Sequence, residues 1–103
     1  VQRQRTTKEQ RMDMNTVPMV RLTWKDAIDS DGTWTDLETI LDHEPATCQE
    51  VGWLVYNGSD KCIIMRSRVV TADNELEEGS AYIAIPQSWV INVEELTPSL
   101  AAV

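Results

Sequence analysis

The stretch CQEVGWLVYNGSDKCIIMRS, Cys48 to Ser67, decides the fold class. Two runs rich in β-branched and aromatic residues flank the tetrapeptide Asn-Gly-Ser-Asp at positions 57–60, whose first two residues tolerate positive φ. Alternating runs around such a turn are typical of a β-hairpin. We expect Tyr56 to lie opposite Lys61 in it.

In that register the side chains alternate between the two sides of the hairpin. Cys62 falls on one side and Cys48 on the other, so the two cysteines form no disulfide unless a bulge, for which Gly52 is the natural place, shifts the strand. The first side also carries Val51, Trp53, Val55, Ile64 and Arg66. The second side carries Leu54, Tyr56, Ile63 and Met65.

Both sides of this hairpin are apolar. A strand pair in a small monomer usually shows one side to water, so the second apolar side predicts a subunit interface. We therefore expect a homo-oligomer. The predicted interface residues are Leu54, Tyr56, Ile63 and Met65.

Upstream of the hairpin, MVRLTWK at 19–25 alternates as a half-buried strand with Val20, Leu22 and Trp24 inward. A loop rich in Asp, Ser and Gly follows. Thr35 with Glu38 three residues later forms a capping-box pattern, which predicts a helix from about Thr35 to Asp42.

That short helix carries one apolar stripe, because Leu37, Ile40 and Leu41 stand at positions i, i+3 and i+4. Downstream of the hairpin, VVTADNELEEGS predicts an acidic loop closed by Gly79, and AYIAIP predicts a strand.

Pro86 ends that strand, because it cannot donate to a ladder and fixes φ. We expect one 3₁₀ turn through Gln87, Ser88 and Trp89, and then a last strand from Val90 to Leu96.

The length of 103 residues fits one domain, whose bulk must come from four Trp and the aliphatic residues because the chain contains no Phe. Residues 1–12 carry a net charge of +3 within a chain of −8, which leaves −11 elsewhere. We expect a basic, extended N-terminal arm at 1–18, a barrel at 19–97 and a C-terminal tail at 98–103. The composition of the arm is also that of a disordered leader, and docking on a neighbouring subunit is the simplest way to order it.

The ending IPQSWVINVEEL, 85–96, resembles the last 3₁₀ turn and strand of Src-homology-3-like barrels. The wider pattern from Val20 to Leu96 resembles small uncharacterised proteins encoded by tailed bacteriophages. This resemblance implies a mainly β, five-stranded barrel with one short helix between its first two strands, and a phage origin. The surface aromatics with which peptide-binding members of that class hold proline-rich ligands are not evident here.

The sequence predicts no catalytic residue, no metal site and no cofactor. His43 is the single histidine, and its place after the helix predicts a role complementing the helix dipole. With Cys48 and Cys62 on opposite sides, it has no partners for zinc. The sequence DSDG at 29–32 lacks the later ligands of a calcium loop.

Arg66 and Arg68 stand at strand spacing on one face, and with Lys61 they are the candidate ligand-binding residues. Two guanidinium groups suit a small phosphate. The alternative is that they neutralise the acidic loop at 73–78.

Three function classes remain. The first is a non-catalytic phage accessory protein in the host cytoplasm, which oligomerises and captures a host protein or a nucleotide-type ligand. The second is a virion or assembly component whose basic arm connects subunits, and the third is a small hydrolase. The acidic body argues against nucleic-acid binding, although it would allow imitation of nucleic acid, and no segment is long enough to span a membrane.

Overall fold

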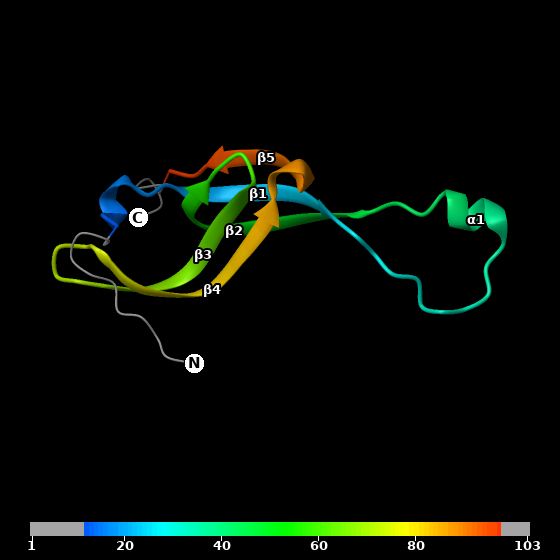
Figure 1. Ribbon diagram of the computed structural model, residues 1–103, viewed down its shortest axis with the longest axis horizontal. Coiled ribbons are helices and arrows are strands. Elements are labelled where there is room, and N and C mark those ends of the chain that lie inside the picture. Colours follow the sequence, from blue (N-terminus) through cyan, green and yellow to red (C-terminus); the bar gives the residue numbers. More distant parts are fainter. Residues whose placement is uncertain (1–11, 98–103) are drawn as a thin grey trace, which may run out of the picture.

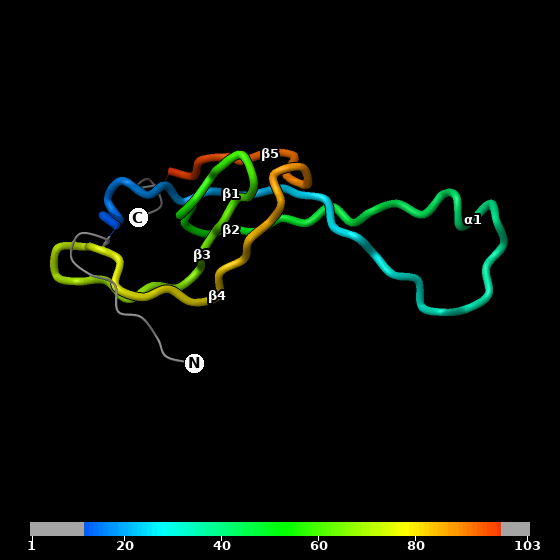
Figure 2. Tube along the Cα trace, viewed as in Figure 1, coloured from blue at the N-terminus to red at the C-terminus, as the bar shows by residue number. Residues whose placement is uncertain are grey.

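The computed structural model describes residues 12–97, which form one five-stranded antiparallel sheet (Figures 1 and 2). Its strands follow the order β4-β3-β2-β1-β5. The elements along the chain are η2 (Met14–Thr16), β1 (Met19–Asp26), α1 (Leu37–Leu41), β2 (Ala46–Asn57), β3 (Lys61–Val70), β4 (Leu76–Pro86), η3 (Gln87–Trp89) and β5 (Val90–Glu95). No helix in this part of the chain is long and apolar enough to cross a membrane.

The predicted mainly β class, the short helix after the first strand and the 3₁₀ turn before the last strand are confirmed. The predicted closed barrel is wrong. In the described residues β4 pairs only with β3 and β5 only with β1, so the sheet keeps two free edges. The single turn at Gln87–Trp89 carries the chain from one edge strand to the other without joining them by a ladder.

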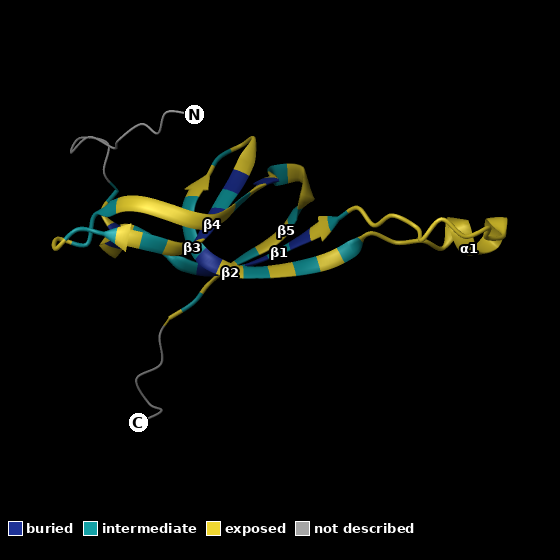
Figure 3. Ribbon diagram, turned by 90° about the horizontal axis from the view of Figure 1, so that it is seen from below, coloured by how far each residue is buried: buried dark blue, intermediate teal, exposed yellow. Residues whose placement is uncertain are grey.

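The core cluster is formed by buried residues of β1, β3 and β4, and buried segments are dark blue in Figure 3. The alternation predicted for β1 is confirmed, since Val20, Leu22 and Trp24 are all buried. From β3 and β4 come Cys62, Ile64 and Ile85, which complete the cluster. Five partly buried residues pack around it, namely Cys48, Leu54, Ile83, Val90 and Val93.

The hairpin is confirmed, but its predicted register is wrong. Tyr56 pairs with Ile63 rather than Lys61, and Leu54 pairs with Ile64. A bulge at Val55 separates these two pairs. An extra residue in one strand changes which side chains share a face, so a period-two argument from the turn fails beyond it.

The bulge also corrects the prediction for the cysteines. Cys62 belongs to the core and Cys48 packs against the same cluster, so they do not face opposite sides. Both are free thiols. Burial raises the pKa of Cys62 because it disfavours the thiolate.

The sequence misplaced two further boundaries. The N-cap position of the helix is held by Asp36, without a side-chain hydrogen bond, rather than by Thr35. The hydroxyl of Thr35 donates to the carbonyl of Thr33 instead. The predicted acidic loop is largely strand, because β3 runs to Val70 and β4 begins at Leu76. A short turn with Asn74 at φ 60° joins them.

The start of the described chain docks on this turn. The N–H of Met14 donates to the carbonyl of Asn74 at 2.9 Å, and that of Leu76 donates to the carbonyl of Met12 at 2.7 Å. Met14 is buried. Residues 12–18 of the predicted N-terminal arm therefore contact their own domain, and residues 1–11, like the predicted tail at 98–103, lie outside the described residues.

Gly52 allows β2 and β3 to approach closely. A Cβ there would stand 2.7 Å from the carbonyl oxygen of Met65, and backbone cannot move aside. We expect Gly52→Ala to lower the free energy of unfolding by about 2–3 kcal/mol in urea denaturation. A Cβ at Gly79 would collide instead with the flexible side chain of Met65, so Gly79→Ala should cost about 1 kcal/mol or less. If both variants lost the same free energy of unfolding, the backbone contact at Gly52 would not be the tighter of the two.

Candidate functional site

A long loop leaves the sheet between β1 and β2. Asp26 and Ala46 pair at its base, and residues 27–45 extend away from the strands (Figure 1). We call this segment the α1 loop. All its residues are exposed, as the continuous exposed colouring in Figure 3 shows.

The α1 loop is ordered by its own hydrogen bonds. The carboxylate of Asp31 accepts hydrogen bonds from the hydroxyl of Thr33 at 2.7 Å and from the N–H of Thr33 at 3.0 Å. Both bonds lower the pKa of Asp31, and the bond from the hydroxyl has the larger effect. At the base, Nε2 of His43 lies 2.9 Å from the carbonyl oxygen of Ile28. His43 thus joins the two sides of the loop, a role that the helix-dipole argument missed.

The far end of the loop presents four large apolar side chains. Trp34 is 103% exposed, and Leu37 and Leu41 are 69% and 73% exposed. Together with Ile40 they form the group that we call the apolar tip. The predicted helical stripe exists, but its side chains are exposed to solvent. Several large apolar side chains exposed on one short segment are typical of an interaction site.

The loop is also strongly acidic. Residues 27–45 contain six Asp or Glu residues and no Lys or Arg. Of these carboxylates, those of Asp29, Asp42 and Glu44 make no hydrogen bond or ion pair with any described residue. The α1 loop therefore combines an apolar tip with uncompensated negative charge.

The predicted ligand-binding residues are not gathered together. Arg66 forms an ion pair with Glu50, and the guanidinium of Arg68 lies 3.8 Å from the centre of the Trp53 ring. Lys61 stands at the other end of β3, 3.7 Å from the carboxylate of Asp60. Arg66, one of the two arginines that could neutralise the acidic residues 73–78, therefore pairs with a carboxylate of β2.

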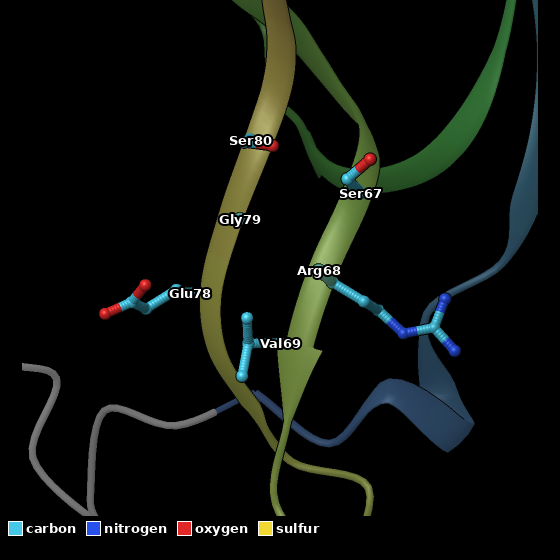
Figure 4. Close-up of a pocket in the computed structure, with 6 residues that line it drawn as sticks. All are labelled: Ser67, Arg68, Val69, Glu78, Gly79 and Ser80. Atoms are coloured by element: carbon cyan, nitrogen blue, oxygen red, sulfur yellow. The ribbon is translucent and has the colours of Figure 1, made fainter.

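An open pocket lies where β3 and β4 run side by side (Figure 4). Arg68 points away from β4 there, toward the beginning of the described chain. Its Nε is buried without a hydrogen-bond partner. The lining residues are Ser67, Arg68, Val69, Glu78, Gly79 and Ser80.

The predicted interface residues have different surroundings. Leu54 packs against the core and Met65 is buried, so these two side chains are used by the domain itself. Ile63 is half-buried, and Tyr56 is exposed with its hydroxyl 3.2 Å from Asp60. The four side chains of the apolar tip are more exposed than any of these, and the sequence showed three of them only as a helical stripe.

Within residues 12–97 no three His, Cys, Asp or Glu side chains are grouped so that they could hold a metal ion. No protein-family model, curated protein or solved structure matches this chain.

Proposed function

We propose that this protein acts without catalysis, as a binding protein that presents the α1 loop to a partner. The main support is that Trp34, Leu37 and Leu41 are exposed on a loop that forms hydrogen bonds within itself. A Trp side chain removes about 150–250 Å² from water when it is buried, so a partner that covers the tip gains substantial apolar contact. A loop that is preorganised by such bonds loses little conformational entropy on binding.

A protein surface is a better partner for this chain than a small anion. The guanidinium groups of Arg66 and Arg68 are engaged by Glu50 and Trp53, and a phosphate would have to displace the carboxylate from Arg66. The acidic loop itself repels anions. Capture of a host protein by a phage accessory factor is therefore favoured over capture of a nucleotide.

We propose that this chain resembles Src-homology-3-like domains in the order and connections of its strands, and not in the closure of a barrel. A long connection between the first two strands and a 3₁₀ turn before the last support it. The partner-binding element would then be the first connection, which is also the part of the described chain most exposed to solvent.

The test compares three tagged baits in host lysate: the wild type, a tip variant and a sheet variant. The tip variant carries Trp34→Ser, Leu37→Ser and Leu41→Ser, and the sheet variant carries Tyr82→Ser and Ile91→Ser at two other exposed apolar positions. We expect partners, including further copies of the chain, to be held by the wild type and the sheet variant and lost by the tip variant. Partners retained equally by the tip variant would contradict the proposal.

A further inference from the structure

We propose that the α1 loop of one copy binds the basic segment, residues 1–11, of a second copy, so that copies associate head to tail. The inference rests on the proposed function, since it names a partner for the same loop. It follows from charge, from the chemistry of the apolar tip and from the position at which the basic segment joins the fold.

The charge distribution points to the basic segment. Residues 1–11 contain Arg3, Arg5, Lys8 and Arg11 against one Glu, a net charge of +3. The remaining chain has five Lys or Arg against sixteen Asp or Glu, which leaves −11. The rest of a second copy therefore repels the acidic loop, while its first eleven residues attract it.

The cations of the described residues are already engaged. Arg21 pairs with Glu94 at 2.7 Å, and Lys25 donates to Thr47 at 2.8 Å. Lys61, Arg66 and Arg68 have the partners described above. These five cations thus have contacts within their own fold and stand among sixteen Asp or Glu, whereas four of the five charged residues of the basic segment are cations.

Arginine also suits the apolar tip. Guanidinium groups stack on indole faces, and the chain uses this contact once already, at Arg68 and Trp53. The aliphatic stems of Arg and Lys cover apolar surface while their charged ends reach carboxylates. Such a segment can therefore lie over Trp34 and Leu37 while its charges pair with the acidic residues of the loop.

The site where the basic segment joins the fold favours an intermolecular contact with the apolar tip. Met12 is held beside the β3–β4 turn through Leu76, at the end of the molecule opposite α1 (Figure 1). The longest dimension is 59 Å, whereas eleven fully extended residues span about 36–40 Å. The segment is too short to run the length of its own molecule. A contact that joins two different surfaces in this way produces rings or open chains.

Light scattering coupled to size exclusion tests the proposal with two full-length variants. The segment variant carries Arg3→Glu, Arg5→Glu, Lys8→Glu and Arg11→Glu. The loop variant has five neutralised carboxylates: Asp29→Asn, Asp36→Asn, Glu38→Gln, Asp42→Asn and Glu44→Gln. Asp31 stays, because it shapes the loop.

We expect the wild type to associate at low salt, and its apparent dissociation constant to rise at least about tenfold between 50 and 300 mM salt. Each variant alone should be monomeric. A mixture should form a 1:1 dimer. In that mixture only the segment variant keeps an acidic loop and only the loop variant keeps a basic segment, so a single contact can form and the assembly grows no further. Neutralising Asp73, Glu77 and Glu95, which lie outside the loop, should change nothing.

A wild type that stays monomeric at low salt, a variant that associates like the wild type, or a mixture without dimer would each overturn the inference. The proposed function is judged separately by the tip variant. If that variant loses its partners while charge reversal leaves the oligomeric state unchanged, the α1 loop is a binding element and its partner is not the basic segment.

Discussion

Replacing Leu22 with alanine is expected to lower the free energy of unfolding by about 3–4 kcal/mol. Leu22 is completely buried in β1, where its neighbours across the ladders are Glu50 of β2 and Val93 of β5. The surrounding side chains come from a sheet that cannot collapse into the vacated space without breaking ladders, so a cavity remains. At about 4–8 °C per kcal/mol for a domain of this size, Tm should fall by about 12–30 °C.

Leu37→Ala is the matched control, because it removes the same atoms from a side chain that is 69% exposed. We expect its free energy of unfolding to stay within about 0.5 kcal/mol of the wild type. Urea denaturation with an unchanged m-value measures both effects. Similar losses for the two variants would mean that α1 packs on the sheet in solution, contrary to the structure.

Much of the fold was predictable because its signals are local. The alternation of Val20, Leu22 and Trp24 requires only that one side of a strand be buried. Pro86 ends β4 through its own chemistry, whatever the strand packs against. The class, the hairpin and the 3₁₀ turn could therefore be derived from short stretches of sequence.

The register could not be derived in this way. A bulge at Val55 exchanges the faces of the hairpin beyond it, yet Val55 has the composition of an ordinary strand residue, and the sequence pointed to Gly52 instead. Glycine is needed at position 52 for a different reason, because the backbone of Met65 lies too close to leave room for a Cβ atom. Such contacts depend on the neighbouring strand, which local patterns do not describe.

The exposure of the apolar tip was missed for a related reason. The periodicity of Leu37, Ile40 and Leu41 shows that a helix has an apolar side, but it does not show what lies opposite that side. The sequence argument placed the surplus apolar surface on the hairpin at Leu54 and Met65. Those two side chains are used within the domain, whereas the four side chains of the apolar tip are all exposed.

Replacing residues 27–45 with an Asn-Gly turn is expected to leave the sheet intact and to raise its free energy of unfolding by up to about 2 kcal/mol. Asp26 and Ala46 already pair across the base, so a two-residue turn can join them directly. Shortening a nineteen-residue connection to two residues removes about three doublings of length, each worth about 0.6 kcal/mol of closure entropy. The variant should lose every partner that depends on the loop.

A second replacement separates length from side chains. Nineteen Gly and Ser residues in place of 27–45 keep the connection long but remove Trp34, the apolar tip and the acidic charge. We expect this variant to match the wild type in stability within about 0.5 kcal/mol, because the loop contributes nothing to the core, and to lose binding as completely as the short turn does. A fall of more than about 1 kcal/mol in either variant, measured by urea denaturation, would show that the loop supports the fold, which would contradict its assignment as a binding element alone.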